Sequence, residues 1–258
     1  MDLGLDGKVV LVTGGSDGLG LALCSRLAAE GARVGFCGRD ADRVDAAASA
    51  LREAGAEIEG VRADVTVPED LVRFVSAAAE RWERVDGLVN NAGRSAATPV
   101  VDSTDIEWED DLSLKLLAAV RLTRLVLPHL RARGGSIVNV LAIGAKTPAA
   151  SSAPSSVSRA AGLALTKALS RELGPDGVRV NAVLIGLVAS GQWRRMASGQ
   201  GVTEEELYDR MAEGSGIPLG RVGRAEEFAD TVSFLLSDRA SYVSGTALNI
   251  DGGLCAVT

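Results

Sequence analysis

Short apolar runs alternate with longer segments of helical periodicity along most of the chain. The run Val9–Thr13 (VVLVT) is apolar up to its final threonine, which is typical of a strand buried on both faces of a sheet. In the longer segments, apolar residues recur at the spacing that places them on one face of a helix. The predicted strands are Val9–Thr13, Arg33–Cys37, Glu57–Arg62, Gly87–Asn90, Ser136–Leu141, Val178–Leu184 and Ala247–Ile250. The predicted helices are Gly18–Glu30, Ala41–Ala54, Pro68–Trp82, Ile106–Arg131, Val157–Leu173 and Ala225–Leu236.

This alternation predicts an α/β fold of the Rossmann type. Strand–helix–strand units of this length cross over with a right hand and place their strands parallel in one sheet. We therefore expect a doubly wound, seven-stranded parallel sheet in a single domain that covers residues 1–258. Residues 190–216 interrupt the pattern with polar, helix-prone sequence, and we interpret them as a flap over the ligand-binding edge of the sheet.

Composition and charge narrow the class of protein and its partners. Of the 258 residues, 47% are hydrophobic, which suits a large buried core, and the net charge is −7. A chain this acidic argues against nucleic acid or an anionic membrane as a partner, and a small-molecule substrate is expected instead. The sequence shows neither the basic start of a secretory signal nor an apolar stretch long enough to span a membrane.

The cysteines and the histidine exclude several kinds of chemistry. Cys24, Cys37 and Cys255 are scattered and lack metal-ligand spacing, which is typical of reduced thiols in a cytoplasmic protein. His129 is the only histidine, so neither a histidine-based metal site nor a Ser-His-Asp triad is predicted.

The segment Thr13–Gly20 (TGGSDGLG) joins the first predicted strand to the first predicted helix. Gly14 permits a tight turn, while Gly18 and Gly20 let the backbone approach a pyrophosphate. The free N–H groups and the dipole at the helix N-terminus favour an anion at the same place. The spacing G-x-x-x-G-x-G differs from the commoner G-x-G-x-x-G of dinucleotide sites, and a simple turn is the alternative.

Further motifs follow the later strands. Asp64 in "RADV" ends the third strand, where its carboxylate can accept a hydrogen bond from an adenine amino group, and "NNAG" (Asn90–Gly93) and "DGG" (Asp251–Gly253) follow two others. With the glycine loop, these motifs resemble those of the short-chain dehydrogenase/reductase family over essentially the whole chain. The resemblance implies a domain that binds NAD(H) or NADP(H) and forms a homo-oligomer, either a tetramer or a dimer. It implies cofactor contacts by Gly14, Ser16, Asp17, Gly18, Leu19, Gly20, Arg39, Asp64, Val65, Asn91, Ala92, Gly93, Arg159 and Val188.

The end of the second strand favours NADP(H) over NAD(H). An acidic residue there would bind both ribose hydroxyls and repel a 2′-phosphate, but the sequence has Gly38 followed by Arg39. A guanidinium suits a phosphate monoester because it can donate two hydrogen bonds at once. Asp17 argues the other way, since relatives that prefer NADP often carry a basic residue at this position. NAD(H) therefore stays possible, and Arg39 can also be an ordinary surface arginine.

The four catalytic positions implied by the resemblance all carry other residues. The family uses an asparagine on the long helix, a serine after the fifth strand, and a tyrosine and a lysine four residues apart. Those positions hold Lys115, Ala142, Ser155 and Arg159, and the first tyrosine in the chain is Tyr208. The sequence is thus identified as a divergent member that lacks the Asn-Ser-Tyr-Lys set.

The replacements allow a different chemistry. Arg159 can bind the nicotinamide ribose but cannot release a proton near neutral pH. Ser155 is a shorter and weaker acid than tyrosine. Lys115 is either a proton donor with a lowered pKa, an anchor for an acidic substrate, or a partner of Asp110 or Asp111.

Other polar residues nearby favour ordinary roles. Lys146 suits a solvated loop and Tyr208 a helix surface. No histidine is available to activate a serine nucleophile, so loop and helix-capping roles explain the serine cluster. That cluster comprises Ser151, Ser152, Ser155, Ser156 and Ser158.

Three functional hypotheses remain, and we favour the first. It is an NADP(H)-dependent oxidoreductase that transfers hydride to or from a small carbonyl compound, imine or enone, with Lys115, Ser155 and Arg159 as catalytic residues. The second is an enzyme that uses the nucleotide as a scaffold for a non-redox step, and the third is an inactive nucleotide-binding relative.

Overall fold

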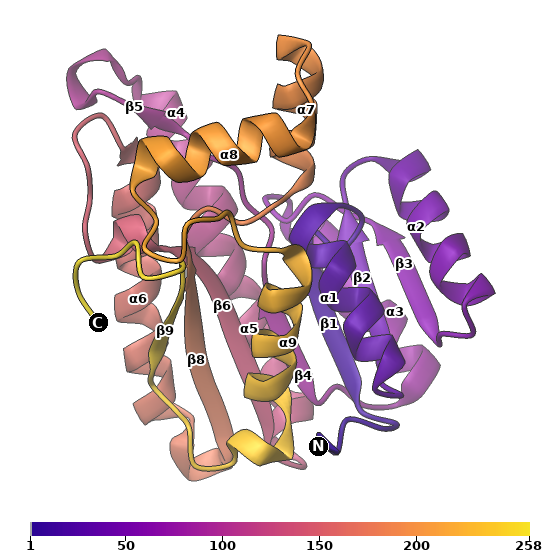
Figure 1. Ribbon diagram of the computed structural model, residues 1–258. Coiled ribbons are helices and arrows are strands. Elements are labelled where there is room, and N and C mark those ends of the chain that lie inside the picture. The colour runs from indigo at the N-terminus through magenta and orange to yellow at the C-terminus, as the bar shows by residue number, and fades with distance from the viewer. Residues whose placement is uncertain (1) are drawn as a thin grey trace.

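A seven-stranded parallel sheet forms the centre of the protein, which the computed structural model describes over residues 2–258 (Figure 1). The strand order β3-β2-β1-β4-β6-β8-β9 reverses direction between β1 and β4, which is the place where doubly wound folds bind ligands. Each observed strand differs from its predicted range by at most one residue at either end, so the predicted Rossmann-type sheet is confirmed. The strands are β1 (Val9–Thr13), β2 (Arg33–Gly38), β3 (Ile58–Arg62), β4 (Gly87–Asn90), β6 (Gly135–Ala142), β8 (Val178–Ile185) and β9 (Ala247–Ile250).

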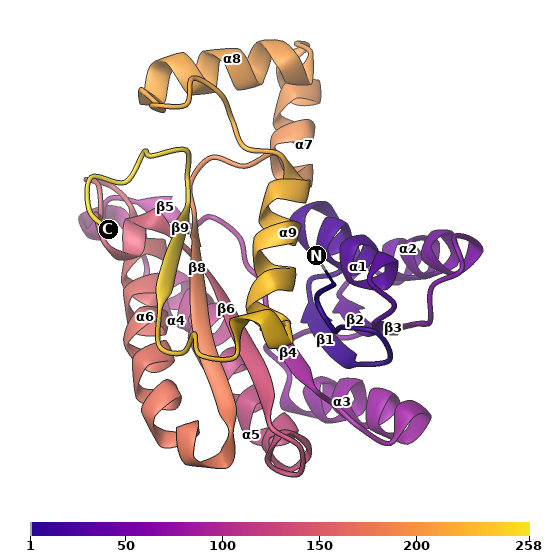
Figure 2. The same ribbon diagram turned by 60° about the horizontal axis from the view of Figure 1, so that its bottom comes forward.

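Helices cover both faces of the sheet (Figures 1 and 2). On one face, α1 (Gly18–Ala29), α2 (Ala41–Glu53) and α9 (Ala225–Leu236) bury a core that contains Phe36 and Phe228. On the other face, α3 (Pro68–Trp82) and α5 (Ala118–Arg131) pack around residues such as Phe74. Alternate side chains of each buried strand point to opposite faces, so both clusters share the same strands. No helix between residues 2 and 258 combines the length and the hydropathy that a membrane span requires.

The long helix predicted over Ile106–Arg131 is interrupted by a π-helical turn. It consists of α4 (Asp105–Leu112), the π turn Ser113–Leu117 and α5. A capping box between Thr104 and Glu107 starts α4. Neither glycine nor proline marks the turn in the sequence, so the interruption was not predictable from local signals. π turns frequently occur at functional sites, and this one carries Lys115 at its centre.

A second, two-stranded sheet joins the loop after β4 to the start of α6 (Ser155–Glu172). Its strands, β5 (Ala97–Thr98) and β7 (Ala153–Pro154), are too short to leave a pattern in the sequence. Next to them, the Ala96 N–H donates to Ser155 Oγ at 3.1 Å and the Ser155 N–H donates to the Ala96 carbonyl at 3.3 Å. These contacts hold Ser155 as the first residue of α6, two positions before the predicted start of the helix.

Residues 190–216 form two helices, α7 (Gly191–Gln200) and α8 (Glu204–Ser215). Both project beyond the carboxyl ends of the strands, at the top of Figure 1, and the rotated view of Figure 2 shows the same arrangement. α7 meets the glycine loop, where Arg195 Nη1 donates to Asp17 Oδ2 at 2.8 Å. The placement agrees with the flap interpretation, which stays a prediction.

The glycine loop packs too closely for a side chain at Gly20. A Cβ atom there would lie 2.0 Å from the Gly14 carbonyl oxygen and 2.7 Å from Asn91 Nδ2. We predict that Gly20→Ala lowers the free energy of unfolding by about 1–3 kcal/mol through overpacking. Gly214→Ala is the matched control, because Gly214 lies in α8 and no side chain or other segment of residues 2–258, its chain neighbours aside, comes within 4 Å of the added methyl group. Urea unfolding should show Gly214→Ala to be neutral or more stable by roughly 0.5–1 kcal/mol. Equal stability of the two variants would refute the packing argument.

Candidate active site

A cleft of about 780 Å³ opens at the carboxyl ends of the strands, where the strand order reverses. Its size lies within the range usual for cofactor sites. The cleft is lined by the glycine loop, the end of β2, the "NNAG" segment, the ends of β6 and β8, and the starts of α6 and α7. Most residues predicted to contact a cofactor line this cleft: Gly14, Ser16, Asp17, Gly18, Leu19, Gly20, Arg39, Val65, Asn91, Ala92, Gly93, Arg159 and Val188.

Asp64 is the exception, because it does not line the cleft. Asp64 Oδ1 accepts hydrogen bonds from Thr66 N at 2.8 Å and from Thr66 Oγ1 at 2.7 Å. Oδ1 therefore holds the loop of Asp64 itself, as aspartates in such turns commonly do, and the predicted adenine contact stays a prediction. Val65, the next residue, takes the place at the wall of the cleft.

The end of β2 suits a phosphate monoester. A Cβ atom on Gly38 would lie 2.5 Å from Ser16 Oγ, so an acidic side chain cannot stand there unless Ser16 moves. Ser16, Arg39 and Arg43 line this end of the cleft. Arg43 is partly engaged by Asp40 at 3.3 Å, whereas Arg39 forms no ion pair with any carboxylate of residues 2–258. A hydroxyl and two guanidinium groups match the donors that a 2′-phosphate needs.

Asp17 connects the glycine loop to α7. Its Oδ1 accepts from the Gly18 N–H at 2.8 Å, which caps α1, and its Oδ2 accepts from Arg195. Burial raises the pKa of Asp17, but the hydrogen bonds from Arg195 and the Gly18 N–H outweigh burial and leave the pKa below its usual value. Asp17 is therefore ionised near neutral pH and has a structural role in addition to lining the cleft.

At the other end of the cleft, four polar side chains form a buried cluster. Lys115 Nζ donates to Asp111 Oδ1 and, at 2.5 Å, to Ser155 Oγ. Ser158 Oγ donates to Asp111 Oδ2 at 2.6 Å. The side chains of Lys115 and Asp111 are only 4% and 1% exposed, so this ion pair is almost completely removed from water.

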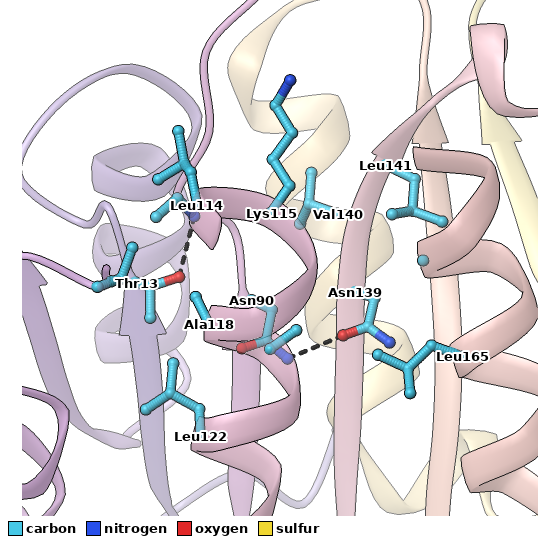
Figure 3. Close-up of a pocket in the computed structure, with 14 residues that line it drawn as sticks. Thr13, Asn90, Leu114, Lys115, Ala118, Leu122, Asn139, Val140, Leu141 and Leu165 are labelled. Carbon is cyan, nitrogen blue, oxygen red and sulfur yellow. Dashed lines mark hydrogen bonds between the residues drawn. The ribbon is translucent and has the colours of Figure 1, made fainter. Parts of the chain in front are cut away.

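The π turn aims Lys115 at the cluster. Figure 3 shows its side chain extending away from the Asn90–Asn139 pair, toward the carboxyl ends of the strands. A cavity of about 20 Å³, which suits one water molecule, has both Lys115 and that pair in its wall. Asn90 Nδ2 donates to Asn139 Oδ1 at 2.8 Å and thereby joins β4 to β6 beneath the site.

The environment shifts the pKa of Lys115 well below its usual value. Burial contributes most and lowers the pKa, the hydrogen bond to Asp111 raises it, and the charges of Arg159 and Arg94 lower it again. The result is a pKa of about 8, down from 10.5. A lysine with such a pKa is protonated in most molecules at neutral pH but can release its proton in a reaction.

Ser155 lies between Lys115 and the cleft. Its oxygen accepts one hydrogen bond from Lys115 Nζ and one from the Ala96 N–H, which uses both of its lone pairs. No acceptor within residues 2–258 takes the Ser155 hydroxyl hydrogen, and Ser155 lines the cleft. The hydroxyl group is thus arranged to donate into the cleft.

Arg159 and Ala142 complete this end of the site. Arg159 Nη1 donates to the Val140 carbonyl at 3.0 Å, and burial lowers the pKa of its guanidinium. No carboxylate in the described chain comes within 4.0 Å of Arg159. Ala142 lines the cleft without offering a hydrogen bond.

Lys146 and Tyr208, the other two side chains considered from the sequence, lie outside the buried cluster around Lys115. Lys146 Nζ donates to the Ala247 carbonyl at 3.1 Å and to Asn249 Oδ1 at 2.8 Å, so it ties its loop to β9 and is not a freely solvated charge. Tyr208 donates to Glu204 at 3.1 Å on α8.

The serines around Ser155 bind mostly to each other and to the backbone. Ser156 Oγ donates to Ser152 Oγ at 2.8 Å, and Ser152 Oγ donates to the Ala149 carbonyl at 2.6 Å. These bonds agree with the loop and helix-capping roles expected for the serines at positions 151–158.

Asp111 was predicted only as one of several possible partners of Lys115. Its position four residues before Lys115 on a helix was a usable signal, because such side chains lie next to each other.

Comparison with known proteins identifies the family. A family model described as enoyl-(acyl carrier protein) reductase matches residues 14–255. The human dehydrogenase/reductase SDR family member 4 is 35% identical over 254 residues, which cover 96% of this chain and 88% of that protein. The chain belongs to the short-chain dehydrogenase/reductase family. A protein named as a ketoacyl reductase of the granaticin polyketide synthase of Streptomyces violaceoruber is 38% identical, over 95% of this chain and 92% of that one.

Solved structures of this family superpose along the whole chain. The L-sorbose reductase of Gluconobacter frateurii, in complex with NADPH and L-sorbose, has a TM-score of 0.94 and 33% identity, with 100% of both chains covered. An NADPH-bound short chain oxidoreductase of Pseudomonas aeruginosa PAO1, described as containing an atypical catalytic center, has a TM-score of 0.92 and 36% identity. That match covers 98% of this chain and 99% of the other.

The buried cluster predicts an unusual titration of Lys115. The chain has only four lysines, at positions 8, 115, 146 and 167, so NMR of protein carrying ¹³C-labelled lysine resolves few signals. We expect one signal, assigned by its loss in Lys115→Arg, to titrate at about 8. Asp111→Asn should move that titration to lower pH, because Asp111 raises the pKa of Lys115. Titration of Lys115 near 10.5, its ordinary value, would show that the cluster is wrongly described.

Proposed function

We propose that this protein is an NADP(H)-dependent oxidoreductase with a non-standard active site, in which Ser155 and Lys115 supply the proton that accompanies hydride transfer. The reaction would reduce a small carbonyl compound, imine or enone, or run in the opposite direction. The observation that carries the proposal is the position of the Ser155 hydroxyl, which accepts hydrogen bonds from buried Lys115 and from the Ala96 N–H and lines the cleft.

The adenosine end supports NADP(H) as the cofactor. Ser16, Arg39 and Arg43 offer a phosphate-binding set, and Gly38 stands where an acidic residue would favour NAD(H). Related proteins of known structure have been solved with NADPH bound. When bound, the cofactor supplies the hydride, and this chain's residues bind it and handle the proton.

The proton path runs from Lys115 through Ser155 to the substrate. In the direction of reduction, the substrate carbon gains a hydride and its oxygen gains the Ser155 hydroxyl proton. Lys115 Nζ returns a proton to Ser155 Oγ in the same event, so the serine never bears a full negative charge. Lys115 is then reprotonated from solvent. A donor whose pKa is close to the working pH is the most efficient general acid, and Lys115 meets that condition.

Arg159 and Asp111 support this path without giving up protons. Arg159 lines the cleft beside Gly93 and can hydrogen-bond the ribose hydroxyls, as the lysine of the family does. Asp111 holds Lys115 Nζ in line with Ser155, and Ser158 fixes the other oxygen of Asp111. Asp111 is therefore a positioning residue that acts through Lys115.

We also expect a homo-oligomer, either a tetramer or a dimer. Leu117 and Val157, on the helices that the family uses for assembly, are 43% and 48% exposed.

Arg39 should determine the choice of cofactor. We predict that Arg39→Ala weakens NADPH binding by about 10–100-fold and leaves NADH binding nearly unchanged, since only the former has a 2′-phosphate. Fluorescence titration of both nucleotides measures the effect, with Arg171→Ala as a control at an exposed position of α6. Equal losses for both nucleotides, or tighter binding of NADH to the unaltered protein, would argue for NAD(H).

Removal of the proton donors should slow reduction. In single-turnover oxidation of bound NADPH by a panel of ketones, imines and enones, we expect Ser155→Ala and Lys115→Met each to reduce the rate about 10²–10⁴-fold. For the unaltered protein, the rate of reduction should fall as the pH rises through about 8, because Lys115 must be protonated. In Asp111→Asn the fall should occur at lower pH.

Two outcomes would contradict this account. If the pH profile is the same with and without Lys115, that residue is not the proton donor. If NADPH binds tightly but no acceptor oxidises it, the non-redox or inactive alternatives are correct.

A further inference from the structure

The charges around Ser155 are unbalanced in favour of cations. Arg94 and Arg159 line this end of the cleft, while the acidic residues of the cleft wall, Asp17 and Asp40, lie at the glycine loop and after β2. Asp111 is buried behind Ser155 and is already paired with Lys115. The substrate end therefore holds a positive charge in a chain whose net charge is −7. A cleft lined by one sign of charge concentrates ligands of the opposite sign.

Arg94 is the cation that is free to bind a ligand. It follows "NNAG" directly, and its side chain is 56% exposed at the wall of the cleft. Its nearest carboxylate is that of Asp110, at 3.8 Å, which is beyond hydrogen-bonding distance, and Asp110 is itself 63% exposed. Exposed pairs of this kind hold the guanidinium only weakly.

The backbone that follows Arg94 is fixed relative to Ser155. Ala96, two residues later, exchanges two hydrogen bonds with Ser155, and β5 pairs with β7 just beyond. The charge of Arg94 acts on Lys115 as well, where it lowers the pKa. Arg94 thus lies on the Ser155 side of the cleft and not at the adenosine end.

Arg159 adds to the positive potential, but we assign it to the cofactor ribose and not to the substrate. One of its nitrogens is bound to the Val140 carbonyl, and the rest of its guanidinium faces the cleft beside Gly93. A partly buried cation with no carboxylate partner in residues 2–258 is stabilised when an anion binds nearby.

We propose that the substrate bears an anionic group, a carboxylate or a phosphate, and that Arg94 binds this group while the reacting carbon lies beside Ser155. The inference rests on the proposed function for the reaction, but binding of the anion does not depend on turnover. The planar guanidinium of Arg94 can donate two parallel hydrogen bonds to either group, which fixes the orientation of a small molecule in an otherwise open cleft. Arg94 is then a specificity-determining residue for small, anionic carbonyl compounds.

Pairs of compounds that differ by one charged group test this proposal. Acetoacetate and methyl acetoacetate form the carboxylate pair, and dihydroxyacetone phosphate and dihydroxyacetone form the phosphate pair. Calorimetry with the protein, with and without saturating NADPH, measures binding, and single-turnover oxidation of NADPH measures reaction. We expect the charged member of at least one pair to bind about 10–100-fold more tightly, and the preferred pair identifies the anion.

Variants at position 94 show whether Arg94 causes the preference for the charged compound. Arg94→Gln should remove the preference and leave the neutral member unchanged, and Arg94→Lys should retain part of it because the charge stays while the planar fork is lost. Arg171→Gln serves as the control for a lost surface arginine, and thermal unfolding verifies that each variant is folded.

The outcomes separate the two proposals. A preference for the charged member that depends on Arg94, without any oxidation of NADPH, supports the anion site and refutes the redox function. Oxidation of NADPH without a preference for either charged compound refutes the anion site. Equal losses for charged and neutral members in Arg94→Gln would show that Arg94 is only a surface residue of the loop.

Discussion

The buried ion pair between Lys115 and Asp111 is the interaction on which the chemistry of the site depends. Removing two charges from water costs several kcal/mol for each ion, and that cost is offset only when the remaining hydrogen-bonding groups are satisfied. Here Ser158 and Ser155 provide those bonds, and the π turn brings Lys115 to them. The same burial that makes the pair costly also lowers the pKa of Lys115 to about 8.

The two ends of the cleft are built on different physical principles. At the glycine loop the backbone sets the shape of the cleft, because a Cβ atom on Gly20 would overlap the Gly14 carbonyl oxygen. At the other end, Lys115 from the π turn contacts Ser155 at the start of α6, and Arg94 from the loop after β4 lines the cleft. Lys115 reaches the Ser155 hydroxyl from a neighbouring helix, at the opposite end of the cleft from the glycine loop.

Features with a local signal were predictable from the sequence, and features that depend on distant packing were not. Buried parallel strands are continuous apolar runs, so their positions were predicted to within one residue, and the glycine loop was placed correctly. The π turn leaves no such mark, and the two-residue strands β5 and β7 are too short to show a pattern. The hydrogen bonds from Thr66 to Asp64 Oδ1 were not predicted, because the motif was interpreted only as a cofactor contact. Lys146 was expected in solvent, and only the fold shows that β9 lies within its reach.

The direction of the hydrogen bonds at Ser155 is the central claim, and neutron diffraction of deuterated protein with NADPH, at a pH below 8, observes it directly. The account predicts a fully protonated Lys115 Nζ, with one deuteron directed at Asp111 and another at Ser155 Oγ. It predicts that the Ser155 deuteron points into the cleft, toward the substrate position. A neutral Lys115 that accepts the Ser155 deuteron, or a Ser155 deuteron bound to another protein acceptor, would contradict the proposed proton path.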